Sequence, residues 1–185
     1  MNGLQDSPRA KRDATISALR ANLVAFAIAV PLAALQGFIF IALFGMGVAS
    51  AAWTTALLSL VIGGMILHEM LHVWGFRLFG RVPDTAVRLG FNWRAFAPFA
   101  HVSVPVTAAA YRQAALLPGV VLGVLPAAAG MAVGSGLVVA FAVIMQVAAL
   151  GDVLIVWQLR DVGPDEYVSD HPSRIGCEIV RGPKG

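Results

Sequence analysis

The sequence has little charge and almost no cysteine. Only 12% of its 185 residues are Asp, Glu, Lys or Arg, about half the share found in soluble domains, and 58% are hydrophobic. A soluble globule could not cover its surface with so few charges, and a disordered chain would be poor in apolar residues. The single cysteine, Cys177, excludes an internal disulfide and any zinc site built from several cysteines. These absences indicate an integral membrane protein.

Long stretches without any ionisable side chain divide the chain into membrane spans. Residues 21–67 and 113–151 contain no Asp, Glu, Lys, Arg or His. A bilayer span needs about 20 apolar residues, so each stretch holds a helix, a tight turn and much of a second helix. Small residues mark the two turns, at Gly45–Gly47 and at Gly134–Gly136. We expect four transmembrane helices, over residues 21–46, 53–79, 113–133 and 137–159.

The basic residues orient the predicted bundle. Every Lys and Arg lies in residues 1–20, 77–112 or 160–185, and four spans put these three segments on the same side of the membrane. The positive-inside rule then makes both termini cytoplasmic, in the inner (plasma) membrane of what the composition suggests is a bacterium. The net charge of +3 could indicate nucleic-acid binding, but the arginines lie beside the membrane spans, where attraction to anionic lipid headgroups explains them better. We therefore expect the lipid bilayer as a partner, and no nucleic acid.

The segment between the second and third spans is expected to form a short β-hairpin. Residues 85–91 are rich in strand formers, residues 96–106 are again largely apolar, and several prolines interrupt the segment. The predicted fold class is all-α integral membrane, with four transmembrane helices and this hairpin-like insert. The predicted organisation is a cytoplasmic segment at 1–20, a membrane domain at 21–159 with its insert at 80–112, and a mostly extended cytoplasmic tail at 161–185.

Deep in the predicted spans, the ionisable residues are His68, Glu69, His72 and Asp152. Charged groups are costly in hydrocarbon and are usually functional there. Residues 68–72 read His-Glu-Met-Leu-His, the HExxH pattern. On a helix, positions i and i+4 lie on one face, so His68 and His72 can bind one metal ion while Glu69 takes a proton from water. This pattern predicts a Zn²⁺ site.

A catalytic zinc ion usually has three protein ligands, so a third residue is needed. Asp152 is the only acidic residue of the fourth span. The second and fourth spans run in the same direction, and counting residues to Arg77 and Arg160 places Asp152 at nearly the depth of the two histidines. Asp152 is therefore the best third ligand. The alternative is a structural pair with Arg160, two helical turns away.

Four short motifs together resemble a small bacterial family of zincin membrane peptidases of unknown physiological role. The site layout is also similar to the site-2 protease class of intramembrane metalloproteases. The matching pieces cover about residues 55–180. They are His68-Glu69-Met70-Leu71-His72, Leu117-Pro118-Gly119 within residues 111–126, Gly151-Asp152-Val153-Leu154, and Asp170-His171-Pro172 in the tail.

The resemblance implies zinc held by His68, His72 and Asp152, with Glu69 as the catalytic base. In site-2 proteases an Asn-Pro element precedes the late aspartate, whereas Ala149-Leu150-Gly151 precedes it here, so the resemblance to that class is closer at the two histidines than at the third ligand. The sequence also has no PDZ-like module that would select substrates.

These observations predict a zinc-dependent intramembrane metalloprotease that cleaves membrane proteins or peptides near the cytoplasmic face. An edge strand of the hairpin is expected to hold an unwound substrate segment. His101 is a candidate catalytic residue that donates a hydrogen bond to the oxyanion, and its alternative is an ordinary surface-loop histidine. His171 is a candidate substitute ligand or a contact within the tail.

Two other hypotheses stay open. A metal-binding membrane protein without protease activity, such as a carrier or sensor, would keep His68, His72 and Asp152 but would not need Glu69. A structural bundle would use the four polar residues as a hydrogen-bonded network and would bind no metal. The sequence leaves the substrate and the oligomeric state open.

Overall fold

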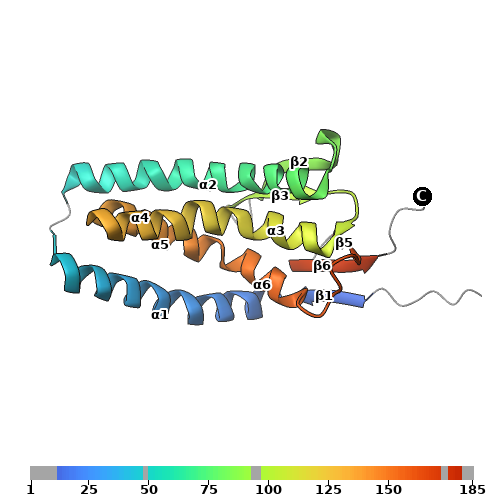
Figure 1. Ribbon diagram of the computed structural model, residues 1–185, viewed down its shortest axis with the longest axis horizontal. Coiled ribbons are helices and arrows are strands. Elements are labelled where there is room, and N and C mark those ends of the chain that lie inside the picture. The colour runs from blue at the N-terminus through green and yellow to red at the C-terminus, as the bar shows by residue number, and fades with distance from the viewer. Residues whose placement is uncertain (1–11, 48–49, 93–96, 172–174, 181–185) are drawn as a thin grey trace, which may run out of the picture.

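Four helical rods form the molecule, and a small sheet closes one end of the bundle (Figure 1). The computed structural model describes residues 12–47, 50–92, 97–171 and 175–180. The rods match the predicted spans to within a few residues at each end, and all are long and apolar enough to cross a bilayer. They are α1 (Ala18–Phe44); α2 (Ala51–Gly80); α3 (Ala108–Pro118) continued by the π-helix η2 (Gly119–Val124) and α4 (Leu125–Val133); and α5 (Gly136–Ala148) followed by α6 (Leu150–Gln158).

Short polar side chains and glycines set the ends of these helices. The helix-initiating residues that accept a hydrogen bond from the backbone N–H three positions later are Ser17, Ser50, Thr107 and Ser135. Gly45 and Gly134 follow α1 and α4 with φ of 79° and 65°. Glycine adopts this left-handed conformation without steric cost, so both predicted turns occur where the small residues gather.

The rods pack with different closeness. Helix α2 approaches α3 so tightly that a Cβ at Gly75 would lie 2.7 Å from Ala114 Cα. Within the described part of the chain, helix α1 makes its main contacts with α5 and α6. A polar clip joins it to α5, where Gln36 Nε2 donates to Gln146 Oε1 at 2.7 Å, and Gln146 Nε2 reaches the Gly123 carbonyl oxygen at 3.3 Å.

A four-stranded antiparallel sheet corrects the expectation of an all-α chain with an unpaired tail. Its order is β1 (Arg12–Ile16), β6 (Ile175–Val180), β5 (Tyr167–Asp170) and β4 (Val106–Thr107). The tail thus pairs with both the N-terminal segment and the residues that precede α3. Strands β1 and β4 are far in sequence from the tail strands with which they pair, and β4 has only two residues. No local sequence pattern therefore predicts these pairings. We call this end of the bundle the sheet end.

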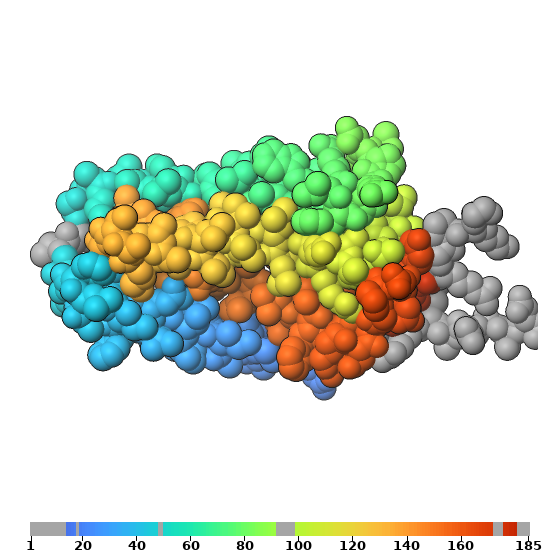
Figure 2. All heavy atoms as spheres, in the orientation of Figure 1, coloured from blue at the N-terminus to red at the C-terminus, as the bar shows by residue number. Residues whose placement is uncertain are grey.

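The largest buried cluster lies at the sheet end, where the tail covers the ends of the helices. Phe76, Leu159, Val168 and Cys177 belong to it, together with Tyr111. Burial raises the pKa of the Cys177 thiol to about 12, so this thiol stays protonated at neutral pH. Figure 2 shows α6 and the tail, orange to red, filling the space beside α1 and α3 at this end.

The predicted hairpin is present between the second and third rods. After the 3₁₀ turn η1 (Asp84–Ala86), β2 (Val87–Asn92) pairs antiparallel with β3 (Ala97–Val102). The residues that connect the two strands, 93–96, lie outside the described residues. Strand β3 lies against α2, and this contact brings the hairpin to the ionisable residues of the span.

Candidate metal centre

The HExxH residues lie on α2, in the part of the helix nearer the sheet end. The spacing of His68 and His72 by four residues brings their rings together on one face, with ring centroids 4.9 Å apart. Both histidines are buried, at 7% and 8% exposure. Apart from Tyr111 and Cys177, they are the only buried residues with a polar side chain among those that the structure describes. Burial of two neighbouring imidazoles requires polar partners, because an unpaired polar group is costly in an apolar surrounding.

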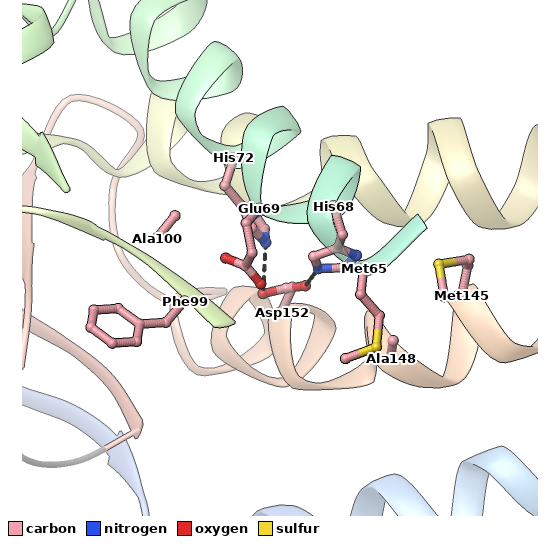
Figure 3. Close-up of a pocket in the computed structure, with 9 residues that line it drawn as sticks. All are labelled: Met65, His68, Glu69, His72, Phe99, Ala100, Met145, Ala148 and Asp152. Atoms are coloured by element: carbon pink, nitrogen blue, oxygen red, sulfur yellow. Dashed lines mark hydrogen bonds and ion pairs between the residues drawn. The ribbon is translucent and has the colours of Figure 1, made fainter. Parts of the chain in front are cut away.

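Asp152 supplies that partner from α6. Its Oδ2 is 3.1 Å from His68 Nε2, and its Oδ1 is 3.4 Å from His72 Nε2, so one carboxylate contacts both imidazoles (Figure 3). The alternative pair with Arg160 is not formed. Arg160 lies 3.5 Å from Asp161 and stacks over the Trp157 ring instead. Asp152 thus lies beside the two histidines, as the depth argument from sequence predicts.

The three side chains form a suitable donor set for zinc. Their ligand atoms all lie within 4.8 Å of one another. Atoms bound tetrahedrally about 2.1 Å from zinc stand about 3.4 Å apart, close to the two nitrogen–oxygen distances here. Two imidazoles and one carboxylate also leave a fourth position for water, which is typical of catalytic zinc sites and not of structural ones. This chemistry fits the metal that the HExxH pattern predicts.

The surroundings of His72 favour metal binding through its Nε2. Its Nδ1 lies 3.1 Å from the carbonyl oxygen of Ala114, in α3, and a carbonyl can only accept, so Nδ1 carries the proton. Nε2 then keeps its lone pair for a metal, as in most zinc-binding histidines. The close packing of Gly75 on Ala114 places this carbonyl. For His68, the buried Nδ1 has no hydrogen-bond partner in the described part of the chain.

A cavity of about 430 Å³ opens beside the three candidate ligands. The Glu69 carboxylate faces it, beside Ala100 of β3 (Figure 3). The remaining lining is apolar and comes from α2, β3 and α5, through Met65, Phe99, Met145 and Ala148. We call this space the apolar cavity. The HExxH glutamate therefore lies in the same cavity as the three candidate ligands.

A second cavity of about 240 Å³ lies on the other side of the ligands. It shares His72, Ala100 and Asp152 with the first, so the ligand set lies between the two spaces. Its polar lining comes largely from the hairpin and the tail: His101, Tyr111, Asp170 and His171. We call this space the polar cavity. The hairpin contributes to both, as β3 lines each of them.

The other predicted site residues are placed near the ligand set but not in it. His101 lines the polar cavity, and its Nδ1 lies 2.9 Å from Asp170 Oδ2. His171 Nε2 lies 3.6 Å from Glu178 Oε1, and His171 is not part of the metal-binding group found among the described residues. Sequence reasoning assigned no role to Asp170 or to the Ala114 carbonyl. The Asp170-His171-Pro172 motif could have indicated a role for Asp170. A backbone carbonyl has no sequence signal, because every residue has one.

Comparison with known proteins gives one match. A family model with the description "Putative zincin peptidase" matches residues 61–167, which include His68, Glu69, His72 and Asp152. No curated protein and no solved structure matches. The matched region is more than half of the chain and contains the part of α2 that carries the histidines, together with all of α6. The chain therefore belongs to the putative zincin peptidase family, whose name implies a zinc metallopeptidase.

Proposed function

We propose that the protein is a zinc-dependent peptidase embedded in the cytoplasmic membrane, and that it cleaves membrane-associated proteins or peptides near the cytoplasmic face. The observation that carries the proposal is the contact of one carboxylate, Asp152, with both HExxH imidazoles beside a cavity that Glu69 faces. Family membership supports the reaction class. The likeness to the layout of site-2 proteases belongs to the same proposal.

His68, His72 and Asp152 would hold the metal. When bound there, zinc supplies a Lewis acid that polarises a peptide carbonyl and makes a water molecule acidic near neutral pH. Glu69 accepts the proton of that water as it attacks the carbonyl carbon, and then delivers the proton to the amine that leaves. Glu69 lines the apolar cavity together with Ala100 of β3, so its carboxylate is placed to act in both steps.

The membrane setting rests on the four apolar rods and the distribution of arginines. If the sheet end lies in the cytoplasm, the basic segments flanking the rods all lie on that side, as the positive-inside rule requires. At about 1.5 Å per residue, His72 lies about 12 Å along α2 from Gly80, and His68 about 18 Å. The polar cavity then gives water a route to these residues from the cytoplasmic side.

The two cavities suggest where the cleaved bond lies in a substrate. The apolar cavity suits an apolar side chain on one side of the bond, and the polar cavity suits a more polar segment on the other. Such a change of polarity occurs where a transmembrane segment meets the cytoplasm. We expect cleavage at that boundary, with the hairpin holding an unwound substrate strand.

The test compares three purified proteins: wild type, His72→Ala and Glu69→Gln. Zinc content is measured in detergent, and cleavage is measured with a dye-labelled single-span model peptide in proteoliposomes. We expect about one zinc per chain in the wild type and in Glu69→Gln, a loss of zinc in His72→Ala, and a loss of cleavage in both variants. A carrier or sensor would keep its function in Glu69→Gln. Equal zinc in His72→Ala, or undiminished cleavage in Glu69→Gln, would contradict the proposal.

A further inference from the structure

Asp170 is the centre of a small hydrogen-bond network that joins the tail to the site. Its carboxylate accepts from the Tyr111 hydroxyl at 2.6 Å, from the Val102 backbone N–H at 3.0 Å, and lies 2.9 Å from His101 Nδ1. The side chain of Asp170 is 15% exposed, so these contacts are largely shielded from solvent. Three donors from α3 and β3 thus converge on one residue of β5.

The contact with Asp170 determines how His101 presents its other nitrogen. A carboxylate acts as an acceptor, so His101 Nδ1 carries the proton in this pair. The ring is then held at one end, and Nε2 is its remaining polar atom. His101 lines the polar cavity together with His72 and Asp152, and its side chain is 40% exposed. A histidine that is fixed at Nδ1 and open to a cavity beside a metal-binding group is suited to contact a substrate there.

We infer that Asp170 is a positioning residue, which acts through His101 as a catalytic residue. In its imidazolium form His101 donates from both nitrogens, from Nδ1 to Asp170 and from Nε2 to the carbonyl oxygen on which negative charge develops during peptide hydrolysis. Asp170 fixes the ring orientation that this second hydrogen bond needs. The inference rests on the proposed peptidase function, and it makes the tail strand β5 part of the active site.

A purely structural role for Asp170 predicts different behaviour. The bonds from Tyr111 and Val102 show that Asp170 also ties β5 to the rest of the fold. If that were its whole role, replacing it would weaken the sheet end in the same way as loss of a buried apolar contact in β5. Val168 is the matched position for this comparison, because it is fully buried in the same strand and is not among the residues lining either cavity.

The kinetic test uses the model peptide with five proteins: wild type, His101→Ala, Asp170→Asn, the double variant and Val168→Ala. We expect kcat to fall about 100- to 1,000-fold in His101→Ala and about 10- to 100-fold in Asp170→Asn, with KM and zinc content little changed. In the His101→Ala background, Asp170→Asn should cause no further loss. Val168→Ala should lower the melting temperature but leave kcat unchanged below it. Equal losses from Asp170→Asn in both backgrounds, or a comparable fall of kcat in Val168→Ala, would overturn the inference.

A second measurement does not depend on activity. The chain has four histidines, so ¹⁵N spectra of histidine-labelled protein are simple, and the His101 signals are those missing in His101→Ala. We expect the wild type to show a proton fixed on Nδ1 of His101, and Asp170→Asn to change that signature while the His68 and His72 signals stay in place. A His101 spectrum unaltered by Asp170→Asn refutes the positioning role even if the model peptide is not cleaved. Failure of the peptidase proposal itself appears separately, as cleavage that does not depend on Glu69.

Discussion

Helices α1 and α2 are both long and apolar, yet they have different positions in the molecule. The mean hydropathy of the most apolar window is 2.3 in α1 and 1.7 in α2. Only 6% of that window is buried in α1, against 28% in α2. Beyond Arg20, α1 carries no ionisable residue, whereas α2 carries His68, Glu69 and His72 deep in the helix. The polar contact of α1 with α5 is made by Gln36.

The difference shows that hydropathy identifies a span but does not identify the span that carries the site. The less hydrophobic helix is the more buried one, because it gives part of its surface to polar ligands and to small residues that admit close neighbours. Gly64 and Gly75 of α2 both lie against neighbouring helices, whereas Gly37 of α1 has no atom within 4 Å of its added Cβ. We therefore expect substitutions in α2 to affect metal binding and stability much more than matched substitutions in α1.

The largest effect is expected from removing a polar group deep in each helix. His68→Ala removes one of the three proposed zinc ligands, so we expect the affinity for zinc to fall more than about 100-fold, beyond the loss typical of residues that only support a ligand. Gln36→Leu, in α1, should leave the affinity unchanged. Zinc titration of the two purified variants measures both values, and a similar affinity in His68→Ala would show that α2 does not carry the metal.

The next effect comes from the closest helix contact. Gly75→Ala would place its Cβ 2.7 Å from Ala114 Cα, and a backbone atom cannot turn aside. We expect a loss of about 1–3 kcal/mol in stability, together with weaker zinc binding because the Ala114 carbonyl supports His72. In α1, Gly37→Ala should be neutral or stabilise by up to about 1 kcal/mol. Melting temperatures in detergent compare the pair, and equal shifts would contradict the prediction.

A smaller effect is expected from two neighbouring glycines within α2. A Cβ at Gly64 would meet the Phe141 ring at 2.7 Å and Met145 Sδ at 2.9 Å, while a Cβ at Gly63 would meet nothing within 4 Å. The obstacles at Gly64 are ends of side chains that can shift, so Gly64→Ala should cost about 1 kcal/mol and Gly63→Ala nothing. The same melting experiment applies. A larger loss in Gly63→Ala than in Gly64→Ala would show that α2 is packed differently.

The smallest effect is expected from the clip on α1. Gln36→Leu removes both hydrogen bonds between Gln36 and Gln146, and Gln146 keeps the Gly123 carbonyl as a partner. Hydrogen bonds between membrane helices contribute about 0.6 kcal/mol on average, so we expect a fall of melting temperature near the limit of detection. Leu35→Ala, an exposed neighbour, serves as the control. A loss of several kcal/mol in the free energy of unfolding would contradict this prediction, because it would show that the position of α1 depends strongly on the clip.

Features determined by nearby residues were predictable from the sequence. The spans follow from uninterrupted apolar stretches, the turns from glycine, and the proximity of His68 to His72 from helical spacing. Asp152 required one longer step, the matching of depths in two spans that run in the same direction. Its role as a ligand, and those of the histidines, stay predictions, but all three side chains lie together as that argument expected.

Features that depend on distant pairing were not predictable in the same way. Strand β1 pairs with β6 across nearly the whole chain, and neither segment shows a pattern that selects the other. The contact of Asp170 with His101 depends on the same sheet, because β5 carries Asp170 toward the hairpin. The support that Ala114 gives to His72 comes from a backbone carbonyl, a group that every residue possesses.

The pairing of β1 with β6 also affects the order in which the protein is completed during synthesis. Strand β1 leaves the ribosome before the first rod, and β6 follows the last one, so the sheet closes only after all four rods have been made. Asp170, in the strand just before β6, emerges in the same late step. A growing chain therefore carries the HExxH helix long before His101 gains its carboxylate partner. If the protein is a peptidase as proposed, its site is therefore incomplete until the tail strands have been synthesised.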